Sequence, residues 1–237
     1  MNKFAVFDID GTLIRWQLYH VIVNKLAKAG ALGPEAQATL KAAMMAWKRR
    51  EDQNSFKQYE RKLIALYEEA LQNISTELFD QLVSEVIGEY KDQSYVYTRD
   101  LLQRLKKDDY KLFIISGSHL ELIEQVGKHY GFDDWIGTHY ERAEHTFTGQ
   151  VTISTLKKDQ SLKLLLERND VTVEGSVGVG DTKSDIPMLE MVEQPIAFNP
   201  DRDLFTAARQ NGWKIVVERK NVIYELEPSN GQYRLLA

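Results

Sequence analysis

Two carboxylates, a glycine and a hydroxyl follow a short apolar run near the amino terminus. Asp8, Asp10, Gly11 and Thr12 come after residues 4–7, which read Phe-Ala-Val-Phe. Side chains alternate along a strand, so Asp8 and Asp10 would lie on the same side, about 7 Å apart along the backbone. Like charges that close repel, and one carboxylate is protonated unless a cation neutralises the pair. Because oxygen ligands favour Mg²⁺ or Ca²⁺, the spacing predicts a divalent-cation site; the alternative is a turn with a solvated aspartate pair.

A calcium-binding EF-hand shares the pattern Asp-x-Asp-Gly. Its loop requires glycine at position six and glutamate at position twelve. Counted from Asp8, Leu13 and Tyr19 occupy these positions, which excludes an EF-hand. The apolar run instead predicts a buried strand of a parallel sheet, and the carboxyl end of such a strand is where open α/β sheets bind ligands.

Two further predicted strands also end in polar residues. Ser116 and Gly117 follow the apolar residues 112–115, and Asp181 ends the segment 176–181. If the three strands are neighbours, their ends converge on one crevice. The Ser116 hydroxyl and the backbone N–H groups around Gly117 would suit an anion.

Charged side chains near these strand ends are further candidates for the same site. Lys157, Lys158 and Lys163 precede or open a predicted helix, and one lysine aimed at the crevice would neutralise phosphate oxygens. For each of the three, an exposed position is the alternative. Asp185 follows Asp181 at the start of another helix, where it would either cap that helix or support the metal site.

The elements that position these residues fall into two groups. Apolar residues recur at helical spacing from about residue 18 to residue 90, with few β-branched runs. After residue 97, predicted strands and helices alternate, which implies a parallel sheet with right-handed crossovers. We therefore predict an α/β fold: a doubly wound, Rossmann-like core of residues 1–15 and 95–237, with an all-helical cap inserted at residues 16–94. The cap leaves the core just after Asp10, so we expect it to cover the site.

Two details of the predicted core bear on the site. Ser118 and Glu121 have the spacing of a capping box, which predicts that Ser118 caps a helix over residues 120–130. Residues 136–140 and 146–153 are expected to form short strands of the core, and the carboxyl-terminal tail shows no clear pattern.

Composition limits the classes of function. The chain has 237 residues and a formal net charge of −5, which gives no support for nucleic-acid binding. Cysteine is absent, so disulfides and thiolate zinc sites are excluded. No apolar run approaches the length of a membrane span, and the amino terminus lacks the pattern of a secretory signal. We therefore expect a cytoplasmic protein with no membrane partner, and the sequence leaves the oligomeric state unknown.

Four segments in order along the chain carry a family resemblance. They are Asp8-Ile9-Asp10-Gly11-Thr12, Ile115-Ser116-Gly117, the lysine at 158, and Gly180-Asp181-Thr182-Lys183-Ser184-Asp185. Together they resemble the motifs of phosphatases of the haloacid dehalogenase superfamily, and the resemblance spans the whole core. A helical cap between the first and second motifs is similar to the branch that contains phosphoserine phosphatases.

This resemblance implies a Mg²⁺-dependent phosphomonoester hydrolase that acts on a small phosphorylated metabolite. Asp8 would be the nucleophile that forms an aspartyl-phosphate, and Asp10 the general acid and then the general base. The Asp8 carboxylate, the Asp10 backbone carbonyl and Asp181 would hold Mg²⁺. The phosphoryl group would be bound by Ser116, Gly117 and Lys158, with Lys157 as the alternative lysine. The site would be supported by Thr12 and Asp185.

The chain departs from the phosphoserine phosphatases that it resembles at the residues that read the substrate. Those enzymes carry a carboxylate shortly after the first motif and an arginine in the cap, whereas this chain has Gln17 at the first position and Arg61 two residues early for the second. A neutral amide holds an ammonium poorly, so we expect a substrate other than phosphoserine. Two alternatives stay open: a phosphotransferase that uses an alcohol as acceptor, and a non-catalytic metabolite-binding protein on the same fold.

Overall fold

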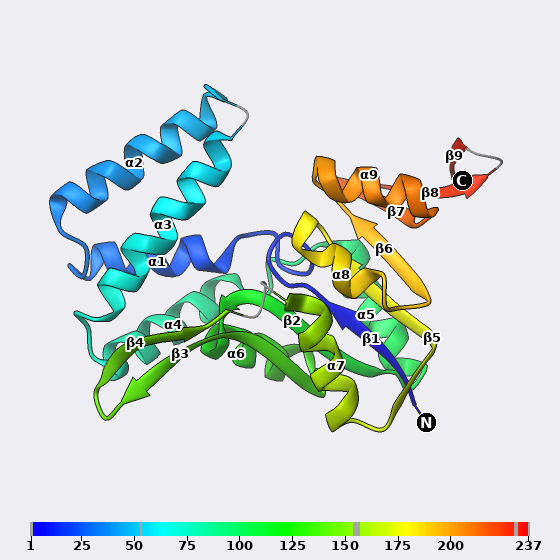
Figure 1. Cartoon of the computed structure of the whole chain (residues 1–237), viewed down its shortest axis with the longest axis horizontal. Helices are drawn as coiled ribbons and strands as arrows, with labels where there is room; N and C mark the ends of the chain where they lie inside the picture. Colours follow the sequence, from blue (N-terminus) through cyan, green and yellow to red (C-terminus); the bar gives the residue numbers. More distant parts are fainter. Residues whose placement is uncertain (1, 53, 154–156, 230–231, 237) are drawn as a thin grey trace. The chain divides into compact units, whose positions relative to one another are not determined.

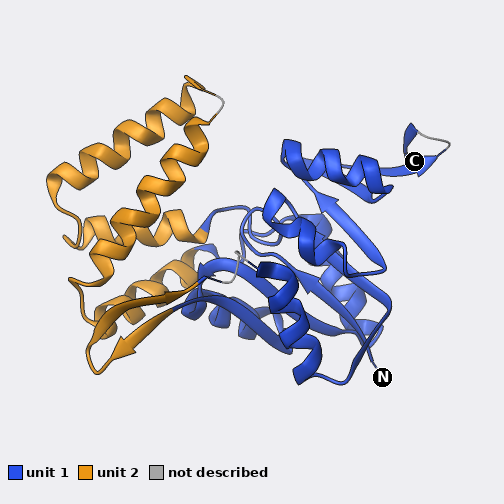
Figure 2. Cartoon of the chain, viewed as in Figure 1, with its two compact units in different colours: residues 1–17, 90–139, 153–237 blue, residues 18–89, 140–152 orange. Residues whose placement is uncertain are grey.

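The structure is a computed structural model that describes residues 2–52, 54–153, 157–229 and 232–236. Its chain forms two compact units (Figure 2). Unit 1 comprises residues 1–17, 90–139 and 153–237, and unit 2 comprises residues 18–89 and 140–152. Each unit therefore contains segments from distant parts of the sequence.

A mostly parallel sheet organises unit 1 (Figure 1). Its parallel strands are β1 (Asn2–Phe7), β2 (Lys111–His119), β3 (Asp134–Ala143), β5 (Val171–Gly180), β6 (Gln194–Phe198) and β7 (Lys214–Arg219). Two antiparallel strands, β8 (Val222–Ser229) and β9 (Gln232–Leu235), continue the sheet from β7. The tail that showed no clear pattern in the sequence thus forms the last two strands on one side of the sheet, with β9 at its edge.

Strand order defines the place where a ligand is expected. Within unit 1 the order is β3-β2-β1-β5-β6-β7-β8-β9, so the chain builds outward from β1 in one direction and outward from β5 in the other. The two directions separate between β1 and β5, which makes this point a topological switch. Ligands of open α/β sheets bind at the carboxyl ends of the strands that flank such a point.

Helices cover both faces of this sheet. The apolar side chains of β1 alternate, so that Phe4 and Val6 belong to a core packed by α7 (Lys158–Arg168), α8 (Ile186–Leu189) and α9 (Arg202–Asn211). Helices α5 (Val96–Lys107) and α6 (Leu120–Tyr130) contact β2, and Figure 1 shows them behind the sheet when α7 and α8 are in front. A doubly wound sheet results, as predicted from the alternation of strands and helices.

Unit 2 combines four helices with a β-hairpin. The helices are α1 (Leu18–Lys28), α2 (Pro34–Lys48), α3 (Ser55–Leu71) and α4 (Thr76–Tyr90). The hairpin joins the end of β3 to β4 (Thr146–Thr152). Arg142 holds it to α4: the guanidinium donates two hydrogen bonds to Asp80, at 3.0 and 2.7 Å, and lies over the rings of Phe79 and Phe147.

The α/β class with a parallel-sheet core and an inserted helical segment is confirmed. The observed units differ from the predicted boundaries by two residues at the first junction and five at the second. The larger difference is that residues 140–152, expected in the core, group instead with the helices. The sequence predicted short strands at residues 136–140 and 146–153 but contained no information on which unit the hairpin packs against. Within the described ranges, none of the helices combines the length and apolar character that a membrane crossing requires.

Replacing the arginine that holds the hairpin should loosen the hairpin selectively. We expect Arg142→Ala to speed amide hydrogen exchange of residues 140–152 by about tenfold, because the bidentate, charge-assisted hydrogen bonds to Asp80 are lost. Arg49→Ala is the matched control, since the Arg49 side chain is 66% exposed and pairs only with nearby Glu51 among the described residues. Unchanged exchange in Arg142→Ala would show that other contacts hold the hairpin.

Candidate active site

Asp8 stands at the carboxyl end of β1, directly after the buried strand. Its backbone N–H donates to the carbonyl of Val179 on β5, 3.0 Å away, which extends the pairing of the two strands by one residue. The chain then turns at Gly11, whose φ of +83° is a conformation that favours glycine. A Cβ at this glycine would also collide with the Asp181 carboxylate, so the turn and the close approach of Asp181 both depend on Gly11.

Lys158 is a buried cation at the centre of the site. Its side chain is 1% exposed, and its ammonium donates to Asp8 Oδ1 at 2.8 Å and to Asp185 Oδ1 at 2.6 Å. A third bond goes to the backbone carbonyl of Ile115 on β2, at 3.0 Å. One ammonium thus joins the end of β1 and the middle of β2 to the turn that follows β5. The neighbouring Lys157 is exposed, so the structure brings Lys158 and not Lys157 into the site.

Asp185 fixes the turn that carries Asp181. Its Oδ2 accepts hydrogen bonds from the backbone N–H groups of Asp181 and Thr182, at 3.0 and 2.9 Å. Thr182 and Asp185 form a capping box on the short 3-10 helix η2 (Lys183–Asp185). The sequence offered two alternatives for Asp185, a cap or a member of the acidic site. In the structure it caps the turn and also lies within the acidic cluster.

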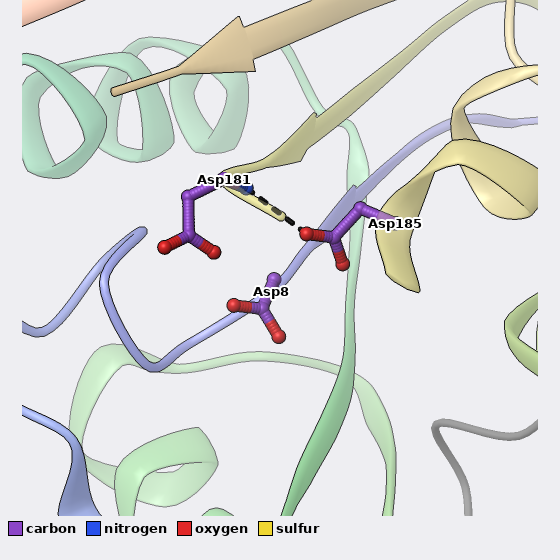
Figure 3. Close-up of side chains that lie close together, drawn as sticks. All are labelled: Asp8, Asp181 and Asp185. Carbon is purple, nitrogen blue, oxygen red and sulfur yellow. Dashed lines mark hydrogen bonds between the residues drawn. The ribbon is translucent and has the colours of Figure 1, made fainter. Parts of the chain in front are cut away.

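The three carboxylates of Asp8, Asp181 and Asp185 gather at one place (Figure 3). One oxygen from each lies within 4.8 Å of the others. Both oxygens of Asp185 are occupied by the bonds described above, and the Thr12 hydroxyl donates to Asp181 Oδ1 at 3.3 Å. Among the described residues, no hydrogen-bond donor reaches Asp8 Oδ2 or Asp181 Oδ2. Two carboxylate oxygens of this group are thus left without a donor among the described residues, and hard oxygen ligands of this kind fit Mg²⁺.

The electrostatics of this cluster disfavour having all of its carboxylates ionised at once. Burial raises the pKa of Asp8 to about 7; repulsion from Asp185 and Asp10 adds to the rise, and Lys158 opposes it. Loss of solvent and repulsion from Asp8 and Asp185 raise the pKa of Asp181 well above its usual range. Burial would lower the pKa of Lys158, but Asp185 and Asp8 outweigh it and raise that pKa. A charged lysine is therefore insufficient to balance the carboxylates, and a divalent cation would complete the neutralisation.

Asp10 is held apart from this cluster by two hydroxyls of β2. Ser116 Oγ and Ser118 Oγ donate to the same oxygen, Asp10 Oδ2, at 3.1 and 2.6 Å. The carbonyl of Gly117, between them, accepts from Thr138 on β3 at 2.7 Å. The end of β2 therefore supports Asp10 on one side and is tied to the next strand on the other.

The structure gathers the predicted site residues at the ends of β1, β2 and β5. The group of three carboxylates comprises Asp8, Asp181 and Asp185, and the binding of metal by the Asp10 backbone carbonyl stays a prediction. Sequence reasoning missed two residues. Ser118 was expected to cap α6, yet it lies in β2 and bonds to Asp10. Asp201 caps α9, and its N–H donates to the Asp181 carbonyl at 2.8 Å; an aspartate before a predicted helix was the available signal.

Comparison with known families identifies this constellation. A family model described as haloacid dehalogenase-like hydrolase matches residues 5–190. The chain belongs to the haloacid dehalogenase-like hydrolase family. The matched residues include all of the strand ends that form the acidic cluster, the buried lysine and the hydroxyls around Asp10.

Relatives of this haloacid dehalogenase-like chain include several hydrolases. It is 25% identical over 231 residues to a phosphoserine phosphatase of Mycobacterium tuberculosis, covering 91% of this chain and 70% of that protein. It is 25% identical over 226 residues to a histidinol-phosphatase of Neisseria meningitidis serogroup C, covering 91% and 99%. A putative hydrolase of Mycobacterium leprae is 26% identical over 163 residues, covering 66% of this chain and 52% of that protein, so the match spans about half of its length.

Solved structures share the fold of this haloacid dehalogenase-like chain. A protein of unknown function from Bordetella pertussis Tohama I has a TM-score of 0.72 at 21% identity, covering 91% of this chain and 98% of that one. A phospho-aspartyl intermediate analogue of phosphoserine phosphatase has a TM-score of 0.62 at 19% identity, covering 92% and 94%. The predicted class, a phosphatase-type enzyme of this family in the phosphoserine-phosphatase-like branch, is confirmed.

Divalent metal should stabilise the protein through the carboxylates of Asp8 and Asp181. At a Mg²⁺ concentration one hundred times the dissociation constant, binding to the folded state adds about 2.7 kcal/mol. For a chain of this length we expect a rise in melting temperature of roughly 5–10 °C, measured by calorimetry with and without chelator.

The same measurement on Asp181→Asn should show little or no response to Mg²⁺. Asp92→Asn is the control, because the Asp92 side chain is 75% exposed and pairs with His129 away from the cluster. In chelator we expect Asp181→Asn to be at least as stable as the wild type, since one of the repelling charges is gone. A full Mg²⁺ response in Asp181→Asn would exclude Asp181 as a ligand.

Proposed function

We propose that this chain is a Mg²⁺-dependent phosphomonoester hydrolase that acts on a small phosphorylated metabolite through an aspartyl-phosphate on Asp8. One observation carries the proposal. The Asp8 carboxylate is bonded to the buried Lys158 ammonium and lies beside Asp181 at the switch point of the sheet. A nucleophile, a cation for phosphoryl oxygens and donor-free oxygens for a metal thus occur together, and phosphoryl transfer mainly requires such positioning and charge neutralisation.

In the first step an oxygen of Asp8 attacks phosphorus, and the bond from phosphorus to the ester oxygen breaks. Asp10 gives its proton to that departing oxygen, so that an alcohol leaves and not an alkoxide. The charge of Lys158 and the hydroxyl and N–H groups at Ser116 and Gly117 hold the phosphoryl oxygens. Asp8 then carries the phosphoryl group as a mixed anhydride.

In the second step the same residues act in reverse. Asp10, now ionised, takes a proton from water, and the water oxygen attacks the phosphorus bound to Asp8. The bond between phosphorus and the Asp8 oxygen breaks, which returns the carboxylate and releases inorganic phosphate. Asp185 keeps Lys158 and the Asp181 turn in place during both steps through the bonds that it makes to each. Mg²⁺, held by Asp8, Asp181 and the Asp10 carbonyl, would supply further neutralisation of the phosphoryl charge.

Every residue named in these steps belongs to unit 1. We therefore assign catalysis to unit 1 and the role of a substrate-selecting cap to unit 2. The first step would be shared with a phosphotransferase, which differs only in using an alcohol as the acceptor. Product analysis in the presence of glycerol separates the two: phosphate alone supports hydrolysis, and glycerol phosphate identifies transfer.

Phosphoserine carries an ammonium group that needs an anionic partner in the site. We propose that the substrate of this chain does not depend on such a partner. Gln17 is the last residue of the first segment of unit 1. Its Nε2 lies 3.5 Å from the point where a Gly11 Cβ would stand, the same point that Asp181 approaches. The amide of Gln17 therefore lies beside the acidic cluster. It is neutral, so it would attract an ammonium less than the carboxylate of phosphoserine-specific enzymes does.

Removing the nucleophile should abolish turnover without unfolding the protein. We expect Asp8→Asn to lower kcat for p-nitrophenyl phosphate by on the order of 10³-fold or more, because an amide cannot form the covalent intermediate. Circular dichroism and melting temperature report the folded state, and Asp92→Asn serves as a control that keeps full activity. A folded Asp8→Asn protein that still turns over substrate would refute covalent catalysis by this residue.

Introducing a carboxylate at position 17 should change substrate preference. We expect Gln17→Glu to raise the ratio of kcat/KM for O-phosphoserine over glycerol phosphate by about tenfold, the effect of one charge-assisted bond. The ratio is used because a general loss of activity cancels in it. Gln17→Ala, which adds no charge, should leave the ratio near that of the wild type. A wild-type protein that already strongly prefers O-phosphoserine would contradict the proposed role of Gln17.

A further inference from the structure

We infer that Ser118 is a positioning residue that holds the Asp10 carboxylate in place for proton transfer. The inference rests on the proposed function, because it assigns Asp10 the exchange of protons with the leaving group and with water. Ser118 is 2% exposed and lies in β2, close to the strand end. Its hydroxyl donates to Asp10 Oδ2 at 2.6 Å, the shorter of the two bonds that β2 makes to this oxygen.

The two serines of β2 are connected to each other as well as to Asp10. The backbone N–H of Ser118 donates to Ser116 Oγ at 3.1 Å, and the Ser116 hydroxyl donates in turn to Asp10 Oδ2. The hydroxyl bonds from Ser116 and Ser118 end on the same oxygen of Asp10, so rotating the carboxylate would break these two together. This arrangement restricts the Asp10 side chain to one orientation before substrate arrives, which is the kind of preorganisation that proton transfer requires.

Ser116 and Ser118 differ in what substrate would demand of them. Ser116 is the residue proposed to bind a phosphoryl oxygen, and a hydroxyl has one proton to donate. When Ser116 donates to the phosphoryl group, its bond to Asp10 is given up. Ser118 then remains as the β2 hydroxyl that donates to Asp10. The structure therefore points to Ser118 as the residue that keeps Asp10 oriented at the moment of reaction.

A positioning role of this kind predicts a dependence on the leaving group. An alkyl phosphate releases a strongly basic alkoxide and needs the proton of Asp10, whereas 2,4-dinitrophenyl phosphate releases a stable anion and does not. We expect Ser118→Ala to lower kcat/KM for glycerol phosphate roughly 10- to 100-fold and to lower kcat/KM for 2,4-dinitrophenyl phosphate much less. The constant kcat/KM is chosen because it reports the steps up to leaving-group departure and is independent of the later attack by water.

Three variants make the experiment decisive. Asp10→Asn should show the same selective loss, only larger, and Ser118→Thr, which keeps a hydroxyl, should restore the wild-type ratio. Ser176→Ala is the matched control, because Ser176 is also a fully buried serine of a core strand, but its Oγ accepts from the N–H of Glu193. Both rate constants come from one preparation, so any loss of folded protein cancels in their ratio.

The outcomes separate this inference from the function on which it rests. Selective loss in both Asp10→Asn and Ser118→Ala supports the role of Ser118. Selective loss in Asp10→Asn with equal losses on both substrates in Ser118→Ala overturns the role of Ser118 and leaves the proposed function standing. A wild-type protein that hydrolyses neither substrate overturns the proposed function, and the inference fails with it.

Discussion

The ion-pair network around Lys158 is the interaction on which the rest of the site depends. A buried ammonium is tolerated only when it is paired and its hydrogen bonds are satisfied, and here Asp8, Asp185 and a backbone carbonyl provide three acceptors. Removing either carboxylate partner would leave an incompletely paired charge in the interior. The network therefore constrains the end of β1, the middle of β2 and the start of α7 to one arrangement.

Lys158 alone does not neutralise the carboxylates around it, and this leaves the site able to bind a further cation. Asp8 and Asp181 remain close together with raised pKa values, so the site favours whatever brings positive charge to it. A divalent cation would supply this charge. The glycine at position 11 keeps the approach to Asp181 open, since any side chain there would meet that carboxylate. Charge and shape thus favour the same kind of ligand.

The sequence predicted the parts of the site that depend on local pattern. Asp8 and Asp181 each follow an apolar strand, and the alternation of strands and helices implied that those strands would be neighbours. The partner of Ser118 could not be predicted in this way, because Asp10 is 108 residues distant and the local spacing to Glu121 equally fits a helix cap. The placement of the hairpin, residues 140–152, was wrong for a related reason. Local sequence predicts a strand, whereas the partner against which the strand packs depends on tertiary contacts such as those of Arg142.

Under the proposed function, the chemistry and the choice of substrate depend on different parts of the chain. The bonds that orient Asp8, Asp10, Lys158 and Asp181 are made within unit 1, by β1, β2, the turn after β5 and the start of α7. Gln17 ends the first segment of unit 1, directly before the chain enters unit 2. A change at this boundary alters what the site attracts without removing any bond of the Lys158 network. On this proposal, one phosphoryl-transfer centre can be combined with different substrates through the residues that follow the first motif and through the inserted unit.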